Sequence, residues 1–163
     1  MPIPSGETKP SVAGLFIGPV KGQPLSSVEK VNAVAGRGLE GDRKLRPAAS
    51  PPADDGPDRE LTLIEAEAIE AAIREYGVQL EAIEARRNVL TRGVALNHLV
   101  GRRFKVGAVL LQGIRLCEPC AHLEALTRKG VRKALVHRGG LRAQIVEGGE
   151  ISLGDPIVPV VSS

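Results

Sequence analysis

Short apolar segments separated by glycines dominate the hydrophobic pattern of this sequence. Residues 11–20 contain the run Val-Ala-Gly-Leu-Phe-Ile and end at a Gly-Pro turn signal, so they are predicted to form a strand. Residues 28–34 are a second, shorter strand candidate. Residues 104–106 and 108–116 are typical of two strands joined by a turn at Gly107.

The C-terminal part of the chain repeats this pattern. Residues 141–147 and 150–158 flank a Gly-Gly pair, which predicts a hairpin with a two-residue turn. Many short strands with regularly placed glycines favour a mostly β fold with helical insertions, of the α+β class, built as a small β-barrel.

Two regions carry a helical pattern. Thr62 and Glu65 fit a capping box that would open a helix, and Gly77 is a plausible stop. Between them the apolar residues recur every three or four positions, at Ala66, Ile69, Ile73 and Tyr76. Residues 118–136 also look helical, with a break at Gly130, and a short helical piece is expected near residues 80–86.

Domain organisation follows from length and local composition. One domain over residues 11–160 is expected for a chain of 163 residues. Residues 1–10 are rich in Pro, Ser, Gly and Lys and are predicted to be a flexible N-terminus. Residues 44–59 contain four prolines and no periodicity, which predicts a long mobile loop.

Composition and charge exclude several classes of protein. The 22 basic and 19 acidic residues give a net charge of +3, too mild for a dedicated nucleic-acid binder, and only three residues are aromatic. The N-terminus lacks a secretory signal pattern, and no run approaches the roughly 18 apolar residues of a membrane span. With two cysteines a disulfide-rich scaffold is excluded, and a cytoplasmic location is the default expectation.

The two cysteines lie in the segment Cys117-Glu118-Pro119-Cys120, where a predicted strand gives way to a predicted helix. Proline favours the first turn of a helix, so Cys120 is expected there as well. The positive end of the helix and the nearby Arg115 favour a reactive thiolate at Cys120, whereas Glu118 acts in the opposite direction.

Other interpretations of the cysteine pair remain open. The spacing also suits a dithiol redox couple, although the surrounding pattern of a thioredoxin-like protein is missing. With His122 or His137 the pair could form part of a zinc site, but a second pair of ligands is not evident. The two cysteines could also be small packed residues without chemistry.

An ordered set of motifs runs along the sequence. The motifs are G-R-G-L-E-G-D-R (36–43), L-T-L-I-E-A-E (61–67), R-N-V-L-T-R-G-V-A-L-N-H-L-V-G (87–101), F-K-V-G (104–107), R-L-C-E-P-C (115–120) and G-E-I-S-L-G-D (149–155). Together they resemble the MOSC domain, the family named for the C-terminal domain of molybdenum-cofactor sulfurases. The resemblance covers roughly residues 11–160 and implies a stand-alone bacterial-type member of the family.

The resemblance implies a barrel-like, mostly β fold and a molybdopterin-type ligand, the molybdenum cofactor. It implies that Cys120 meets molybdenum or carries sulfur. Some stand-alone members reduce N-hydroxylated compounds with an electron-donor partner. Full-length sulfurases add a pyridoxal-phosphate cysteine desulfurase domain, for which 163 residues leave no room, so a desulfurase would be a separate partner. Many members carry Glu-Asn-Leu or Glu-Asn-Phe where this chain has Arg87-Asn88-Val89, and Cys117 is an additional cysteine.

A phosphate-bearing cofactor of this kind needs guanidinium groups and hydrogen-bond partners. Arg92, Arg115 and Arg138 are the first candidates because each adjoins a glycine turn or the cysteine segment. Asn88 and Thr91 are candidates for the pterin. Further arginines lie near glycine-rich turns, at Arg37, Arg43, Arg87 and Arg142.

Three hypotheses therefore follow from the sequence. The first is a MOSC protein that binds the molybdenum cofactor or carries sulfur, with Cys120 as the catalytic residue or metal ligand. The second is a thiol-disulfide redox protein that uses Cys117 and Cys120. The third is a non-catalytic barrel that binds an anion or a protein and whose cysteines only pack.

Overall fold

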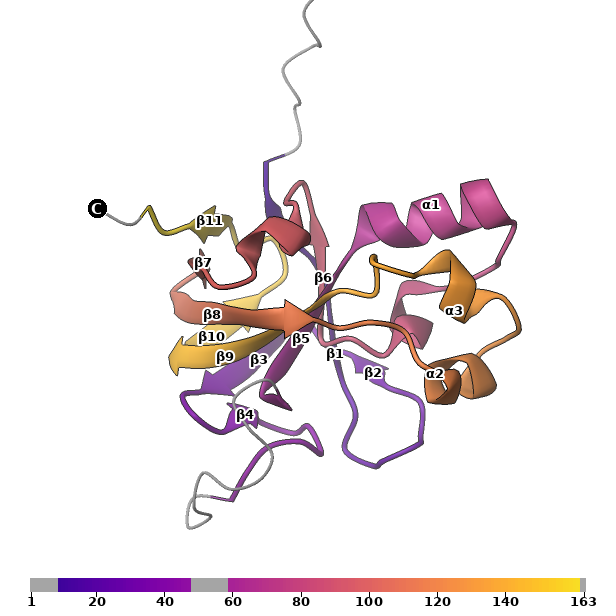
Figure 1. Cartoon of the computed structure of the whole chain (residues 1–163). Coiled ribbons are helices and arrows are strands. Elements are labelled where there is room, and N and C mark those ends of the chain that lie inside the picture. The colour runs from indigo at the N-terminus through magenta and orange to yellow at the C-terminus, as the bar shows by residue number, and fades with distance from the viewer. Residues whose placement is uncertain (1–8, 48–58, 162–163) are drawn as a thin grey trace, which may run out of the picture.

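A computed structural model describes residues 9–47 and 59–161 (Figure 1). Strands predominate in this part of the chain, and its helices include α1, α2 and α3 and the short 3₁₀ helices η2 and η3. In chain order the elements are β1 (Ser11–Ile17), β2 (Ser26–Ser27), β3 (Lys30–Val34), β4 (Gly38–Leu39), β5 (Leu61–Glu65), α1 (Ala66–Tyr76), η2 (Ala82–Ala85), β6 (Val89–Arg92), η3 (Leu96–Leu99), β7 (Arg103–Val106), β8 (Val109–Leu116), α2 (Ala121–Leu126), α3 (Val131–Ala134), β9 (Leu141–Glu147), β10 (Gly149–Ser152) and β11 (Ile157–Pro159).

The strands form two sheets. The eight-stranded sheet has the order β11-β7-β8-β9-β5-β6-β1-β2, and the three-stranded sheet has the order β10-β3-β4. Strands β5 and β6 run parallel, and the helix that connects them, α1, lies with α2 and α3 on one side of the molecule (Figure 1). The mostly β, α+β prediction is confirmed. The two sheets are not closed into a barrel over the described residues, so "barrel" describes the fold only loosely.

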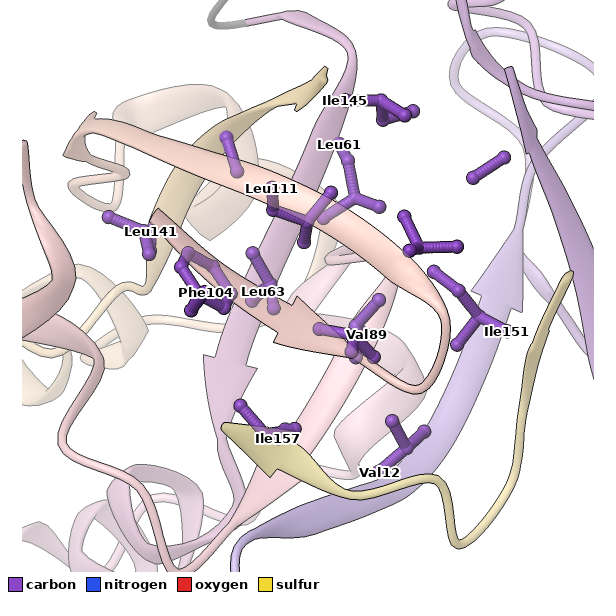
Figure 2. Close-up of a cluster of buried hydrophobic side chains, with 14 of the residues drawn as sticks. Val12, Leu61, Leu63, Val89, Phe104, Leu111, Leu141, Ile145, Ile151 and Ile157 are labelled. Atoms are coloured by element: carbon purple, nitrogen blue, oxygen red, sulfur yellow. The ribbon is translucent and has the colours of Figure 1, made fainter. Parts of the chain in front are cut away.

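The main apolar core lies against the inner face of the large sheet. In β9 the residues Leu141, Ala143 and Ile145 are buried while those between them are only partly buried, which is the period-two pattern of a strand with one buried face. Figure 2 shows how Phe104 of β7 and Leu111 of β8 meet this cluster. The core is therefore aliphatic around a single phenylalanine ring.

A second apolar cluster holds the helices to the other face of the sheet. Ile64 of β5 is its contact with the strands, and Val131 and Leu135 bring in the region of α3. This cluster fixes the connection from β8 through α2 and α3 to β9, which carries the cysteine segment at its start.

The predicted helix start at Thr62 is wrong. Residues 61–65 form β5, which pairs with both β6 and β9, and α1 begins at Ala66. Glu65 does not cap the helix with its side chain; its carboxylate accepts a hydrogen bond from the N–H of Leu96 at 3.2 Å. The predicted stop is confirmed, because Gly77 ends α1 in the left-handed conformation, with φ of 64°.

The predicted C-terminal hairpin is also wrong. Strand β9 pairs with β8 and β5, whereas β10 crosses to the small sheet and pairs with β3. Gly148 permits this crossing because a Cβ atom there would lie 2.5 Å from the carbonyl oxygen of Ala33. The second predicted strand is split, since a turn precedes β11, which pairs with β7.

Part of the predicted mobile loop is described by the structure. Residues 44–47 make defined contacts, and Nη1 of Arg46 lies 3.3 Å from the carboxylate of Glu60 in a largely buried ion pair. Residues 48–58 and residues 1–8 of the predicted flexible terminus lie outside the described residues. Within the described part of the chain, none of the helices has the length and apolar character to cross a membrane.

Candidate functional site

The cysteine segment, residues 117–120, leaves the end of β8 and crosses over the start of β9. The N–H of Cys117 donates to the carbonyl oxygen of Gly140 at 2.7 Å. Beneath the segment lies Gly139, where a Cβ atom would come within 2.3 Å of the Cys117 carbonyl oxygen and 2.8 Å of Pro119 Cδ. The close passage of the segment over β9 therefore requires glycine at position 139.

A buried arginine fixes the segment from the other side. Arg87, only 9% exposed, donates from Nη2 to the carbonyl oxygen of Cys117 at 3.1 Å. The same guanidinium donates from Nε to Gly139 at 2.8 Å and from Nη1 to Ala85 at 3.2 Å. One side chain thus ties together the cysteine segment, the approach to β9 and the end of η2.

Glu118 anchors the middle of the segment. Its carboxylate accepts hydrogen bonds from the backbone N–H of His137 at 2.7 Å and contacts Nδ1 of the same residue at 2.8 Å. His137 is thereby used to hold the segment in place. Contacts within the protein therefore fix the backbone around both cysteines.

The two cysteines differ in exposure. Cys117 is buried, at 2% exposed, whereas Cys120 is exposed. Cys120 is the N-cap of α2 and lies one residue before the first helical turn in which it was expected; its thiol forms no capping hydrogen bond. The exposed thiol is therefore available at the surface, and the buried thiol is packed beneath the segment.

Lys44 lies near the buried thiol of Cys117 and near two arginines, and we call Arg43, Lys44 and Arg142 the cationic cluster. Burial, followed by the charges of Arg43 and Arg142, lowers the pKa of the Lys44 amine. The Cys117 thiol and the Asp42 carboxylate act on this pKa in the opposite direction. The cluster is therefore rich in positive charge and partly removed from water.

Arg142 enters this cluster through the register of the sheet. It lies opposite Thr62 of β5 and opposite Arg115 of β8, so these residues share one face of three adjacent strands. Its Nε atom is buried and has no hydrogen-bond partner within residues 9–47 and 59–161. The sheet thus brings Arg115 and Arg142 to the strand ends that border the cysteine segment.

The structure does not bring Arg92 and Arg138 into this cluster. Arg92 forms a two-pronged ion pair with Glu70 on α1, with N–O distances of 2.9 and 3.1 Å. Arg138 lies 3.5 Å from Glu75, also on α1. Both charges are balanced by carboxylates of that helix.

The remaining predicted residues contact the protein itself. Asn88 is buried, and its side-chain amide accepts from the backbone N–H and the hydroxyl of Thr62, each at 3.1 Å, and donates to Phe16. Thr91 is fully buried, and its hydroxyl donates to the carbonyl oxygen of Ile64 at 3.4 Å. Arg37 donates from Nε to the carbonyl oxygen of Arg46 at 2.6 Å.

Lys44 was not singled out from the sequence. It lies in the segment predicted to be a mobile loop, although it directly follows the Gly-Asp-Arg of the first motif. The position of Lys44 is fixed by Asp42, whose carboxylate accepts from the backbone N–H of Lys44 at 3.2 Å and from that of Gly18 at 2.8 Å. If the first motif had been extended by one residue, Lys44 would have been among the predicted site residues.

A pocket of about 310 Å³ lies between the β1–β2 connection, η2 and the end of α2. Its lining is Gly22, Pro24, Leu25, Ile83, Glu84, Arg86, Leu126 and Thr127. Arg86 joins the pocket to the neighbourhood of the cluster, because Arg43 and Asp42 both act on its charge. Among the described residues there is no group of three or more His, Cys, Asp or Glu side chains that could hold a metal ion by themselves.

Residues 51–158 match the family model of the MOSC domain. The chain belongs to the MOSC domain family. The sequence-based assignment is thus confirmed, and the R-L-C-E-P-C segment lies inside the matched region. A comparison with curated proteins gave no match.

Solved structures of three bacterial proteins share the fold. The YuaD protein of Bacillus subtilis superposes with a TM-score of 0.74 at 18% identity, over 95% of this chain and 98% of YuaD. YiiM of Geobacillus stearothermophilus gives 0.68 at 17% identity, over 93% of this chain and 75% of YiiM. YiiM of Escherichia coli gives 0.68 at 21% identity, over 96% and 71%.

Proposed function

We propose that this MOSC protein binds the molybdenum cofactor and that the Cys120 thiolate is the protein ligand of the metal. The observation that carries the proposal is the asymmetry of the cysteine segment. Its backbone is fixed by Arg87, Gly140 and Glu118, yet it leaves the Cys120 thiol exposed. A fixed backbone that presents an exposed thiol is suited to ligating a metal that binds from solution as part of a cofactor.

The residues present fit such a cofactor. A metal already chelated by an organic dithiolene needs only one soft protein ligand, and a thiolate is soft. The Nε of Arg142, which is buried and has no partner among the described residues, would supply a hydrogen-bond donor for the anionic part of the molecule. When bound, the cofactor supplies the two-electron redox chemistry, and the protein binds and orients it.

The roles of the other residues follow from their contacts. Arg87 and Glu118 position the segment that carries Cys120, while Arg43, Lys44 and Arg142 provide positive charge beside it. Of the arginines predicted from the sequence, Arg43, Arg115 and Arg142 stay candidates for cofactor contact. Reduction of an N-hydroxylated substrate at this site would require a separate electron-donor protein.

The exposure of Cys120 also favours a second role, as a sulfur carrier. The Cys120 thiolate would attack the terminal sulfur of a partner desulfurase's persulfide, which forms a persulfide on Cys120 and releases the partner's thiolate. Such a transfer needs a surface thiol, which Cys120 provides and Cys117 does not.

The test is the molybdenum and pterin content of protein purified from a host that makes the cofactor. The wild type and Cys117→Ala are expected to retain both, and Cys120→Ala is expected to lose most of its molybdenum during chromatography. Wild-type protein without either component, or a Cys120→Ala variant that retains both fully, would overturn the proposal. Sulfane sulfur on Cys120 without molybdenum would assign the carrier role instead.

A further inference from the structure

Among the described residues, the cationic cluster has fewer negative than positive charges around it. Arg43, Lys44 and Arg142 lie close enough for the first and third to act on the Lys44 amine. Asp42 is the carboxylate that also acts on this amine. A fourth cation, Arg86, is close enough to be influenced by Arg43 and Asp42. In the part of the chain that the structure describes, several cations around one carboxylate leave an excess of positive charge at this point.

The carboxylate of Asp42 is already in use. Oδ1 accepts from the N–H of Gly18 at 2.8 Å, and Oδ2 accepts from the N–H of Lys44 at 3.2 Å. Nη1 of Arg43 lies 3.7 Å from the same carboxylate. Asp42 therefore shapes the loop and balances Arg43. Within residues 9–47 and 59–161, Lys44 and Arg142 have no carboxylate of their own.

The two remaining cations have donors to spare. The Nε of Arg142 is buried without a hydrogen-bond partner in the described residues, and buried polar groups are nearly always paired with protein, water or ligand. The Lys44 ammonium forms no ion pair within 4 Å among residues 9–47 and 59–161, and burial lowers its pKa. An external anion would satisfy both groups.

We propose that Lys44 and Arg142, assisted by Arg43, form a binding site for a phosphate monoester. A guanidinium and an ammonium together offer several donors to a tetrahedral dianion, and charge-assisted hydrogen bonds of this kind are the strong ones. This site rests on the proposed function in one respect: the phosphate belongs to the cofactor whose metal Cys120 would ligate.

The cationic cluster and Cys120 lie close enough for one ligand to reach both. Cys117 lies near enough to Lys44 for its thiol to act on the amine. Three residues of extended chain span at most about 11 Å, which bounds the separation of Cys117 and Cys120. A phosphate-bearing molecule that extends from the cluster to Cys120 would thus bridge neighbouring parts of one site.

The test uses thermal unfolding of protein purified without the cofactor, with inorganic phosphate as the probe, at constant ionic strength set with chloride. The wild-type unfolding temperature is expected to rise with phosphate, and Arg142→Gln and Lys44→Gln are expected to lose most of that rise. Arg132→Gln, an exposed arginine on α3, is the matched control and should keep it. In phosphate-free buffer the two cluster variants are expected to be as stable as the wild type or more so, since each removes an unbalanced charge.

A wild type without a phosphate response, or a response shared equally by all four proteins, would overturn the proposal. Cys120→Ala separates it from the proposed function, because this variant should lose molybdenum but keep the phosphate response. Phosphate binding by a wild type that never acquires pterin would support the anion site and refute the cofactor assignment. Cofactor-loaded protein that still responds to inorganic phosphate would show that the cofactor's phosphate binds elsewhere, against the proposal.

Discussion

Arg87 donates from Nη2 to the carbonyl oxygen of Cys117 at 3.1 Å, across a sequence separation of 30 residues. This contact joins the link between η2 and β6 to the segment that carries both cysteines. Because the guanidinium is buried and also serves Gly139 and Ala85, the position of the cysteine segment depends on one side chain.

Replacing Arg87 should therefore lower the stability of the folded protein. In Arg87→Met three buried carbonyl oxygens lose their charged donor, and we expect the free energy of unfolding to fall by about 3 kcal/mol or more. Arg87→Lys should recover only part of the loss because an ammonium lacks the planar fork of donors. Urea denaturation measures the unfolding free energy of both variants, with Arg102→Met, at an exposed arginine, as the control. Equal stability of Arg87→Met and Arg102→Met would contradict the role of Arg87 in fixing the cysteine segment.

Gly139 is expected to tolerate no side chain. In Gly139→Ala the methyl group would lie 2.3 Å from the carbonyl oxygen of Cys117, so the cysteine segment must move. We expect a loss of about 2–4 kcal/mol in unfolding free energy and a changed reactivity of Cys120. Gly36→Ala is the control, since it has a φ of 72° and no atom within 4 Å of the added Cβ, and should cost only about 1 kcal/mol. Similar losses in the two variants would refute the steric argument.

The two thiols should react with an alkylating reagent at different rates. Cys120 is exposed and Cys117 is buried, so native protein should take up one equivalent quickly, at Cys120, and the second only on unfolding. Peptide mass spectrometry after a short pulse identifies the labelled residue. Rapid labelling at Cys117, or a reversible disulfide between the cysteines that protects both, would favour the redox interpretation of the pair.

Lys44 should make stability depend on pH in the alkaline range. Burial and the neighbouring arginines hold its pKa below the ordinary 10.5 in the folded protein, so the charged amine costs stability at neutral pH. This cost disappears as pH rises from the folded pKa to about 10.5. In phosphate-free buffer the wild type should therefore gain stability relative to Lys44→Met over that range. Lys44→Arg keeps a charge that does not titrate over that range, so the wild type should gain the same amount of stability relative to this variant. Parallel profiles of stability against pH for all three proteins would contradict the assignment.

The sequence predicts the local features of this protein better than its long-range ones. The β7–β8 turn, the end of α1 at Gly77 and the strand-to-helix passage at the cysteines follow from glycine and proline positions. The helix start at Thr62 fails because the same Thr-x-x-Glu spacing occurs in a strand, β5, whose two neighbours pair with it. Local spacing could not distinguish these cases.

The membership of the candidate site depends on pairings between distant residues. Arg142 meets the cluster only because β9 lies between β5 and β8, and Lys44 reaches it only because Asp42 binds Gly18. Arg92 and Arg138 were first candidates by sequence, ahead of Arg142, yet Glu70 and Glu75 of α1 balance their charges. Which arginines have spare donors is a property of the folded chain.

The central claim is that the Cys120 thiolate ligates molybdenum, and X-ray absorption at the molybdenum edge of cofactor-loaded protein tests it most directly. The wild type and Cys117→Ala are expected to show one more sulfur ligand at the metal than Cys120→Ala. The same number of sulfur ligands in all three proteins would contradict the claim.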